Sequence, residues 1–335
     1  MHERDLITRI ASLAGKTSQT TGVIRGIGDD CAVLAPRPGA ALIVTTDTSV
    51  ESIHFDLSFT DARLLGRKTA AVNLSDIGAM GGGPRWAFLN VSMRPGIPDS
   101  FWEAFCRGVT ERLAEWGASL VGGDTVSSHH GLVLTLTLIG EVEPEIWLGR
   151  ANALPGDEIF CSGYLGESAL GLAWLKRKKT TALKPPAAPV HRVVSRHLDP
   201  TPQVALGLAL AQSGLVRSAI DLSDGLATDL AHVCRESGVG AVVQAGAIPV
   251  SRASRTVARL LGLSPLNSAL SGGEDYELLW TAPERHAAEA AAVAARILGR
   301  PPFRIGKIVS DRRGVHLESN RGMREITYQG YEHVA

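Results

Sequence analysis

Short segments in which Asp stands beside Gly, Ser or Thr recur along this chain of 335 residues. They adjoin apolar runs and occur in both halves of the sequence. The segments are GDD (28–30), TTDT (45–48), NLSD (73–76), GGDT (122–125), DLSDG (221–225) and GGED (272–275). Each alone could be an ordinary turn or helix cap, because these residue types favour both. Together they would gather negative charge at one sheet edge, which is unfavourable unless cations bind there.

The donor atoms in these segments are hard oxygens from carboxylates and neighbouring hydroxyls, without a His/Cys cluster. Such donors favour Mg²⁺ over zinc, and Mg²⁺ usually accompanies phosphates. Glycine-rich flanks let backbone N–H groups approach an anion closely while the metal neutralises it from the other side. The sequence therefore predicts nucleotide-dependent phosphoryl transfer or cleavage. Arg150 and Lys68 could contact phosphate, although a solvated surface charge is the commoner role of such residues.

Two familiar nucleotide-binding motifs are excluded. Gly15-Lys16-Thr17 resembles the end of a Walker A loop, but the first glycine of that pattern would be Ile10, and the segment follows a helical pattern. A helix C-cap at Gly15 is the better interpretation. Gly26-Ile27-Gly28 lacks the third glycine of a dinucleotide fingerprint, because Cys31 occupies that place. The sequence also lacks the catalytic-loop motif of protein kinases.

Composition and charge exclude several functions. Lys plus Arg and Asp plus Glu both number 34, so we do not expect a basic surface for nucleic acid or an anionic membrane. No apolar run is long enough to span a membrane, and residues 1–10 lack the apolar core of a signal peptide, so we expect a cytoplasmic protein. Four dispersed cysteines without a CxxC pair predict reduced, mostly buried thiols.

Alternating strand-like and helix-like segments predict an α/β or α+β fold. Expected strands are 40–45, 86–93, 118–121, 132–142, 158–161, 218–222, 241–244 and 276–281, with a β-rich stretch from 303. Expected helices are 61–80, 99–116, 167–178, 204–212, 224–236, 252–261 and 283–298. Pro and Gly residues between Pro144 and Asp157 indicate a boundary, and the length suits two domains. We therefore predict domains at 1–145 and 146–335.

Several motifs, in order along nearly the whole chain, resemble those of the thiamine-monophosphate kinase family. This family belongs to the superfamily typified by aminoimidazole ribonucleotide synthetase. The motifs are GIGDDCAV (26–33), TTDTSVESIHF (45–55), AVNLSDIGAMGG (71–82), VGGDT (121–125), IDLSDGLATDL (220–230), SGGEDYEL (271–278) and GYEH (330–333). The last two resemble the thiamine enzymes more than the selenophosphate synthetases and purine enzymes, which share the Asp-rich theme.

The resemblance implies a two-domain PurM-like fold. Residues 1–145 would form a sheet-plus-helices domain that binds ATP and Mg²⁺ and dimerises, and 146–335 an α/β domain that contributes to ATP, Mg²⁺ and substrate binding. The implied reaction converts ATP and thiamine monophosphate into ADP and thiamine diphosphate, with several Mg²⁺ ions. The implied homodimer packs the sheets of its first domains together. Direct in-line transfer would need no covalent intermediate and no dedicated general base, because the nucleophile is already an anionic phosphate oxygen.

The resemblance also implies roles for single residues. The implied Mg²⁺ ligands are Asp30, Thr45, Thr46, Asp47, Asp76, Asp124, Asp221 and Asp224. Of these, Asp47, Asp124 and Asp224 would be catalytic. The residues implied to contact ATP are Gly123, Asp124, Arg150 and Ser223, and those implied to contact thiamine phosphate are His54, Glu274 and Tyr331. By residue type alone, His54 would more often be an ordinary surface or packed histidine, and Tyr331 could simply tie the end of the chain to the core.

The sequence departs from the family pattern at two places, and it leaves two other functions open. Val334 stands where the family usually has an aromatic residue, and Ala151-Asn152-Ala153 replaces a segment that usually contains glycine. The alternatives are an ATP-dependent synthetase of the same superfamily, of the aminoimidazole ribonucleotide or selenophosphate type, and a non-catalytic nucleotide or Mg²⁺ sensor. Whether the loop 176–189 orders on binding is also open.

Overall fold

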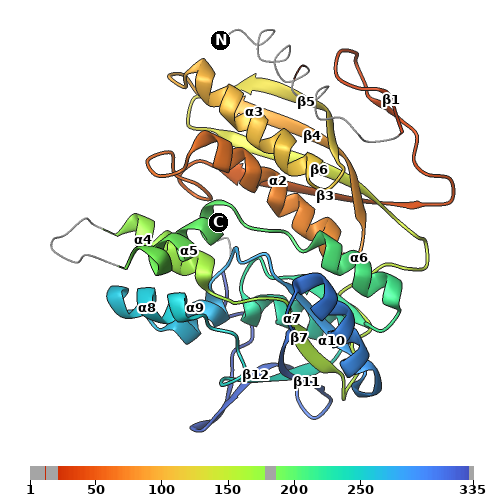
Figure 1. Cartoon of the computed structure of the whole chain (residues 1–335), viewed down its shortest axis with the longest axis vertical. Helices are drawn as coiled ribbons and strands as arrows, with labels where there is room; N and C mark the ends of the chain where they lie inside the picture. Colours follow the sequence, from red (N-terminus) through yellow and green to blue (C-terminus); the bar gives the residue numbers. More distant parts are fainter. Residues whose placement is uncertain (1–11, 13–21, 178–185, 332–335) are drawn as a thin grey trace. The chain divides into compact units, whose positions relative to one another are not determined.

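The fold is given by a computed structural model that describes residues 12, 22–177 and 186–331 (Figure 1). The chain forms two compact units. The first comprises Met1–Ile77 and Gly82–Glu145, and the second comprises Gly78–Gly81 and Ile146–Ala335. Each unit has its own sheet and is described separately. The mixed α/β, two-domain fold class predicted from the sequence is confirmed.

The first unit is built on one main sheet. Its strands, in order across the sheet, are β3 (Ala41–Val50), β6 (Val133–Val142), β4 (Gly83–Met93) and β5 (Ser119–Ser127). Strand β6 is antiparallel to both β3 and β4, whereas β5 is parallel to β4. A short antiparallel pair, β1 (Val23–Arg25) and β2 (Val33–Leu34), precedes the sheet. A parallel pair requires a crossover connection, which α3 (Asp99–Ala114) provides.

Helices α2 (Ala62–Ala79) and α3 cover one face of this sheet (Figure 1). Strand β6 shows the cause in its sequence, because Leu134, Leu136 and Leu138 are fully buried and alternate with partly exposed residues. This period of two is typical of a strand with only one face against the core. The other face of the sheet therefore carries the partly exposed and exposed residues.

The two helices approach each other closely at glycines. A Cβ atom on Gly108 would lie 2.0 Å from the carbonyl oxygen of Arg63, and one on Gly66 would lie 2.0 Å from that of Phe105. At the edge of the contact, Arg63 Nε donates to Glu111 Oε2 at 2.8 Å. The helices can therefore pack at this distance only because both positions lack a side chain.

The second unit contains a larger sheet with the strand order β13-β12-β9-β11-β7-β10-β8. Its strands are β7 (Glu158–Cys161), β8 (Ser218–Asp221), β9 (Gly240–Gln244), β10 (Leu278–Ala282), β11 (Phe303–Val309), β12 (Gly314–Ser319) and β13 (Gly322–Glu325). Neighbouring strands are antiparallel, apart from the parallel pair β9 and β12. Strands β7, β8 and β10 are buried along their whole length, so both of their faces are covered.

Helices supply that cover on both faces. Those on one face are α7 (Leu226–Ser237) and α9 (Pro265–Ser271), and those on the other are α6 (Val204–Ser213) and α10 (Glu284–Leu298). Within β7, Ile159 and Cys161 join the core under α7, whereas Phe160 points into the core under α10. There its ring stacks on that of Trp280 with 5.6 Å between centroids. Because an apolar core covers each face of the sheet, successive residues of these strands are mostly hydrophobic and do not alternate with polar ones.

A third group of helices packs around Leu170, Trp174, Val193 and Val257. It consists of α4 (Glu167–Lys176), α5 (Ala187–Leu198) and α8 (Arg252–Leu261). A Cβ atom on Gly171 of α4 would lie 2.2 Å from the carbonyl oxygen of Val193, so α4 and α5 are in close contact. The second turn of α4 therefore packs directly against α5.

All of the predicted helices are present, but α5 and α9 were not predicted. The prolines at 186 and 189 indicated a loop, yet proline is tolerated in the first turn of a helix, where N–H groups have no partner within the helix. Helix α9 is capped by Ser264, whose hydroxyl accepts the Asn267 N–H at 3.2 Å, and begins at Pro265. Ser followed by Pro is a start signal that the sequence interpretation missed.

Strands β3 and β5 are longer than predicted. They were expected to end at residues 45 and 121 but continue to 50 and 127. Asp47 and Asp124 therefore lie within strands, and the prediction that they follow strand ends is wrong. In β3 the extension is stabilised across to β6, where the hydroxyls of Thr46 and Thr137 are 3.0 Å apart.

Cys31 is exposed and the other three cysteines are buried, which confirms that most of the thiols are buried. Burial raises the pKa of the Cys106 thiol to about 12, so this group is unreactive near neutral pH. Within the part of the chain that the structure describes, no helix has the length and hydropathy needed to cross a membrane. The predictions for Gly15, for the centre of the loop 176–189 and for Val334 lie outside the described residues.

Replacing Gly108 by Ala should destabilise the first unit, because the new methyl group would overlap the Arg63 carbonyl oxygen. Overpacking costs about 1–3 kcal/mol or more, which exceeds the gain of about 1 kcal/mol in helix propensity. Urea denaturation followed by circular dichroism should give a lower midpoint. Gly246→Ala is the control, since nothing lies within 4 Å of its Cβ position. A Gly108→Ala variant as stable as the control would contradict the described helix contact.

Candidate active site

The loop between β8 and α7 carries three of the residues predicted for the site. Asp221 is the last residue of β8, Ser223 and Asp224 follow it, and α7 begins only at Leu226. Gly225, between Asp224 and the start of α7, has a φ of 105°, a conformation that glycine adopts far more readily than other residues. The expected start of the helix at Asp224 is therefore two residues early, because the turn at Gly225 separates this carboxylate from the helix.

Two segments distant in sequence cross this loop and are hydrogen-bonded to its main chain. The Glu274 N–H donates to the Ser223 carbonyl at 2.7 Å, and the Tyr331 N–H donates to the Asp224 carbonyl at 2.9 Å. The structure thus places two of the three residues expected to bind the acceptor directly beside residues expected to bind ATP and metal. All four belong to the second unit.

Glycines allow both crossings. A Cβ atom on Gly273 would lie 2.5 Å from the Ser223 carbonyl oxygen, and one on Gly330 would lie 2.3 Å from the Asp224 carbonyl oxygen. Neither carbonyl could move away without breaking the hydrogen bond that it accepts. These two glycines are therefore required by close approach of the backbone.

The segment around Glu274 has an unusual backbone. Glu274 and Tyr276 have φ values of 64° and 49°, in the left-handed region, although neither is glycine. Such conformations cost free energy and persist only where the surroundings determine them. Here the Tyr276 N–H donates to the Leu222 carbonyl and the Leu222 N–H donates to the Glu277 carbonyl, both at 2.8 Å. The pairing of β8 with β10 thus continues into the site and holds the strained residues.

An additional carboxylate, Asp229 on α7, contacts the same loop. Its Oδ2 accepts the N–H groups of Asp224 at 3.1 Å and Gly225 at 3.0 Å. Burial, followed by the charges of Asp221 and Asp224, raises the pKa of Asp229 well above its ordinary value. The three carboxylates are therefore close enough to repel one another. Carboxylate oxygens are hard donors of the kind that Mg²⁺ prefers, so the chemistry of these residues fits the predicted metal.

Arg150 belongs to a segment that is held against α7. The Ser237 hydroxyl donates to the Arg150 carbonyl at 3.0 Å and accepts the Ala153 N–H at 3.1 Å. Between them, Asn152 has a φ of 82°. Asn tolerates this left-handed conformation better than most other residues do. Asn152 therefore explains how Ala-Asn-Ala can stand where the family usually has a glycine.

His232 of α7 is influenced by the charges of both Arg150 and Asp224. Burial is the main factor that lowers the pKa of His232, the charges of Arg235 and Arg150 lower it further, and the charge of Asp224 opposes them. The imidazole also meets the Tyr328 ring edge to face, with 5.5 Å between centroids. The charges of a residue expected to contact ATP and of a predicted metal ligand thus both act on this one imidazole.

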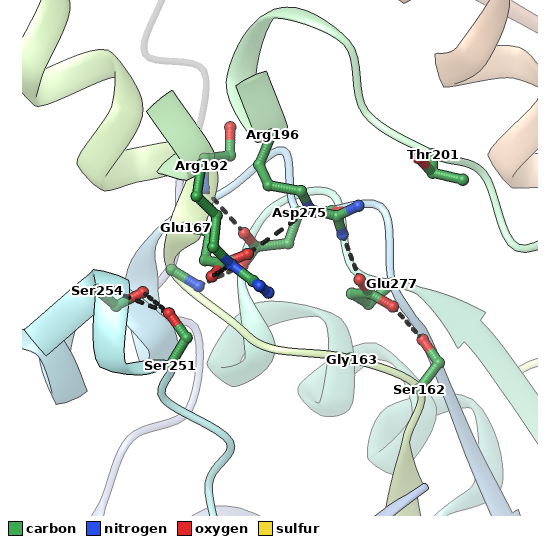
Figure 2. A network of polar contacts seen from close by, with 12 residues as sticks. Ser162, Gly163, Glu167, Arg192, Arg196, Thr201, Ser251, Ser254, Asp275 and Glu277 are labelled. Atoms are coloured by element: carbon green, nitrogen blue, oxygen red, sulfur yellow. Dashed lines mark hydrogen bonds and ion pairs between the residues drawn. The ribbon is translucent and has the colours of Figure 1, made fainter. Parts of the chain in front are cut away.

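A network of ion pairs with buried carboxylates includes Asp275, the residue that follows Glu274 (Figure 2). Its buried carboxylates are Glu167, Asp275 and Glu277. Arg196 of α5 pairs with Glu277 and lies 3.8 Å from Glu167, and Arg192 Nε donates to Glu167 at 2.5 Å. Because a buried charge is costly unless paired, these arginines are what allow the carboxylates to lie there.

Asp275 joins the Glu274 segment to α4. Its carboxylate accepts the Gly166 N–H at 2.6 Å and the Ser168 N–H at 3.2 Å. N–H groups at a helix start have no partner within the helix, so Asp275 caps α4 from a distant segment. Burial raises the pKa of Asp275 to about 7 in spite of these two donors.

In the first unit, Thr45 and Asp76 are in direct contact, because Thr45 Oγ1 donates to Asp76 Oδ2 at 2.5 Å. The register of β3 pairs Thr45 with Leu138 and Asp47 with Leu136, and both leucines are buried beneath the helices. Cross-strand partners lie on the same face of a sheet. Thr45, Asp47 and Asp76 are therefore together on the helix-covered side.

Thr46 and Asp124 are not placed with this group. The Thr46 side chain points to the opposite face, since side chains alternate along a strand. Only its main-chain oxygen could act as a ligand on the Asp47 side. Asp124 lies on β5, three strand spacings from β3, so its Cα is roughly 14 Å from that of Asp47 at about 4.8 Å per spacing. That separation is too large for both carboxylates of one chain to ligate the same ion.

Gly123 lies in β5 with its Cα close to the main chain of β4. A Cβ atom on Gly123 would be 1.9 Å from the Leu89 carbonyl oxygen, and its φ is 150°. The following carboxylate, Asp124, is exposed, and its Oδ1 accepts the Thr125 N–H at 2.8 Å. Glycine thus gives this strand a bare backbone just before a carboxylate, as expected for a phosphate contact.

His54 lies in the turn that follows β3. Its Nδ1 accepts the Val50 N–H at 3.1 Å, so the neutral ring carries its proton on Nε2. Glu51 holds this turn, because its carboxylate accepts two hydrogen bonds from Arg94, at 2.8 and 3.0 Å, and the Leu132 N–H at 2.9 Å. Arg94 also lowers the pKa of Glu51. The imidazole can therefore present an N–H donor to an anion.

Asp30, a predicted Mg²⁺ ligand, follows Asp29, whose side chain is engaged in an ion pair. Asp29 forms an ion pair with Arg25 at 3.2 Å and accepts the Asp30 N–H at 3.1 Å.

Among the described residues, no three His, Cys, Asp or Glu side chains are close enough to hold a metal ion. The predicted ligands are divided between the units, with Asp221 and Asp224 in the second. The full set of eight therefore stays a prediction.

The sequence interpretation gave no individual role to five supporting residues: Asp229, His232, Asp275, Glu277 and His197. Three of them, Asp229, Asp275 and Glu277, stand inside the motifs that carry the family resemblance. A carboxylate inside an otherwise apolar run is the signal that could have identified them. No such signal points to His197, which lies on the unpredicted helix α5.

The comparisons with known proteins agree with this architecture. Residues 28–142 match the model of the AIR synthase related protein, N-terminal domain, and residues 155–317 match that of the C-terminal domain. The chain is 39% identical over 311 residues to thiamine-monophosphate kinase from Escherichia coli strain K12, covering 92% of each chain.

Two solved structures are also similar. The crystal structure of thiamine-monophosphate kinase from Stenotrophomonas maltophilia K279a has a TM-score of 0.81 and 38% identity, with 95% of this chain and 97% of that chain covered. AaThiL complexed with AMPPCP and TMP has a TM-score of 0.74 and 29% identity, with 95% of each chain covered.

The two matched domains and the carboxylate-rich loops define this chain as an AIR synthase related protein. Within that class, the identity over nearly the full length is decisive. The chain belongs to the thiamine-monophosphate kinase family, as the sequence motifs indicated.

Asp275 should make stability depend on pH. Its pKa rises from an ordinary 3.8 to about 7 in the folded protein, so folding takes up a proton between these values. The stability that this group contributes is present below about pH 4 and is lost as the pH rises towards 7, by up to about 4 kcal/mol. The side chain introduced by Asp275→Asn cannot ionise. The difference in melting temperature, wild type minus variant, should therefore decrease as the pH is raised from 4.5 to 7.5.

The exposed Asp311 provides the control, because Arg312 lowers the pKa of its carboxyl instead of raising it. The corresponding difference for Asp311→Asn should not fall over the same range. A constant or rising difference for Asp275→Asn would contradict the raised pKa of Asp275.

Proposed function

We propose that this chain phosphorylates thiamine monophosphate, with ATP as the donor, to give thiamine diphosphate and ADP. One observation carries the proposal beyond family membership: the main chain joins Glu274 to Ser223 and Tyr331 to Asp224. A loop suited to metal and nucleotide thus lies directly beside two residues suited to an acceptor. Transfer between two phosphates requires this juxtaposition. Since ATP would be its co-substrate, we also propose a cytoplasmic location.

The residues expected to hold Mg²⁺ provide oxygen donors in both units. Asp221 and Asp224 supply the carboxylates of the second unit, and their mutual repulsion with Asp229 would be relieved by a cation. Thr45, Asp47 and Asp76 form the corresponding group in the first unit, with Asp30, Asp124 and the Thr46 carbonyl as further donors. When bound, Mg²⁺ neutralises phosphate oxygens and aligns donor and acceptor.

The remaining residues orient the two substrates. Gly123 and Ser223 present main chain to the ATP phosphates, and Arg150 adds a positive charge. His54 can donate its Nε2 hydrogen to the acceptor phosphate. Glu274 and Tyr331 contact the thiamine part, where the ring of Tyr331 can stack on the heterocycle.

Transfer would be direct and in line. An anionic phosphate oxygen of thiamine monophosphate is already a nucleophile, so no residue needs to remove a proton from it. The chain's own contribution is positioning and charge compensation, which together can supply most of the rate acceleration. No residue needs to form a covalent intermediate.

We further propose that two copies associate through the face of the first sheet that α2 and α3 do not cover. Leu42 and Val44 of β3 and Val126 of β5 are 49, 62 and 47% exposed on that side. Hydroxyl pairs such as Thr48 with Thr135, 2.8 Å apart, lie among them. An apolar sheet face of this kind favours a self-complementary partner. A dimer would also allow Asp47 and Asp124 of different copies to serve one site.

The reaction can be tested directly. The protein is incubated with ATP, Mg²⁺ and thiamine monophosphate, and ADP and thiamine diphosphate are quantified by chromatography. We expect ADP to form only when thiamine monophosphate is present, with one thiamine diphosphate per ADP. ADP without thiamine diphosphate would favour a synthetase, and ATP binding without turnover would favour a sensor. Either result would overturn the proposal.

Asp47→Asn should lower kcat by about 100-fold or more, because it keeps the shape of the side chain and removes a charge that the metal requires. Asp29→Asn is the matched control, since Asp29 is engaged by Arg25. We expect it to retain activity within about threefold of the wild type. Melting temperatures should show that both variants fold. Equal losses in the two variants would contradict the assignment of Asp47.

Val44→Lys should convert the dimer into monomers, because it places a charge in the proposed apolar interface. Sedimentation velocity measures the oligomeric state. Leu263→Lys changes a residue of similar exposure, 45%, in the second unit and should leave the dimer intact. A wild-type monomer would refute the dimer, and a dimeric Val44→Lys would refute this interface.

A further inference from the structure

A buried histidine contacts the carboxylate that is expected to bind the acceptor. His197 of α5 is 3% exposed, and its Nδ1 lies 3.2 Å from Glu274 Oε2. The Glu274 side chain is 26% exposed, so a ligand can reach it. Ser168 Oγ, on the first turn of α4, lies 3.1 Å from the same histidine nitrogen. Nothing in the proposed reaction so far uses His197.

The chemistry of the contact fixes the position of one proton. An ionised carboxylate can only accept hydrogen bonds, so a 3.2 Å contact with it is attractive only if His197 Nδ1 carries hydrogen. The hydroxyl of Ser168 can accept part of the same hydrogen. His197 therefore acts as a donor that points at Glu274, and burial prevents water from replacing it.

The contacts around Glu274 close into a ring. Asp275, the next residue, caps α4 through the N–H groups of Gly166 and Ser168. Ser168 contacts His197, and His197 returns to Glu274. The main chain of Glu274 is thus held by the β8–α7 loop, and its side chain is held by α5.

We propose that His197 is a positioning residue that sets the side-chain conformation of Glu274 for binding the thiamine part of the acceptor. This inference rests on the proposed function. A free glutamate side chain has many rotamers, and ordering it on binding weakens affinity by roughly five- to twentyfold. His197 removes that cost by ordering Glu274 before the acceptor arrives. The nucleotide contacts Ser223 and the metal ligands instead, so ATP binding does not depend on His197.

The test compares three substitutions in the full-length protein. His197→Leu removes the donor altogether. His197→Gln removes it from the Nδ1 position, because the Gln amide nitrogen takes the position of Nε2 instead. His197→Asn places an amide N–H close to that of Nδ1. We expect the first two variants to raise the KM for thiamine monophosphate by roughly five- to twentyfold, with the KM for ATP within twofold of the wild type. His197→Asn should restore most of the loss.

Two further variants separate positioning from general damage to the helix. Val193→Ala removes a buried side chain of the same helix. Val193 packs in the apolar cluster with Leu170 and Trp174 and not in the polar ring around Glu274, so the change should lower the melting temperature without changing the KM for thiamine monophosphate. In a Glu274→Gln background, His197→Leu should have less than a twofold further effect, because its partner is already altered.

The outcomes distinguish the inference from the function on which it rests. A wild type with no thiamine-monophosphate-dependent ADP formation would overturn both. A wild type that turns over, with an unchanged acceptor KM in His197→Leu and His197→Gln, would overturn the inference alone. So would equal increases in the KM values for ATP and acceptor, full additivity with Glu274→Gln, or no rescue by Asn. If His197→Leu does not fold, the comparison of Gln with Asn decides.

Discussion

Two main-chain carbonyl groups, those of Ser223 and Asp224, are the constraint on which the second unit's part of the site depends. Each accepts an N–H from a segment that arrives from elsewhere in the chain, at Glu274 and at Tyr331. These hydrogen bonds of 2.7 and 2.9 Å involve no side chains, and glycines must stand beside them because no Cβ atom fits. A backbone contact of this kind fixes relative position more firmly than contacts between long side chains, which lose rotamer freedom when they are ordered.

The surrounding structure compensates for the unfavourable features that this arrangement creates. Left-handed backbone at Glu274 and Tyr276 costs free energy, as does the burial of several carboxylates within one network. Continued pairing with Leu222 holds the backbone, and arginines on α5 compensate the buried charge. Helix α5 therefore has two functions in one packing arrangement, since it neutralises the network and also carries His197. Cores lacking such charges would be easier to stabilise, so their presence beside the site is consistent with a functional requirement.

In the first unit, the alternation of side chains along strand β3 sends the residues of one motif to opposite faces of the sheet. In the run from Thr45 to Thr48, odd positions face the helices and even positions face the exposed side of the sheet. One short sequence thus supplies Thr45 and Asp47 to one side, while Thr46 and Thr48 join hydroxyl pairs on the other. The same sheet serves a candidate metal site and a candidate association surface, because its two faces have separate side chains.

The sequence alone determined the family, the fold class, the helices with clear periodicity and the residue types expected at the site. It could do so because turn glycines, carboxylates and apolar periods are local properties of the chain. Tertiary structure decided which of those residues meet. The crossings at Ser223 and Asp224, the cap that Asp275 places on α4, and the contact of His197 with Glu274 join positions 51 to 109 residues apart. No local pattern encodes such pairs, because each depends on how separately formed elements pack against one another.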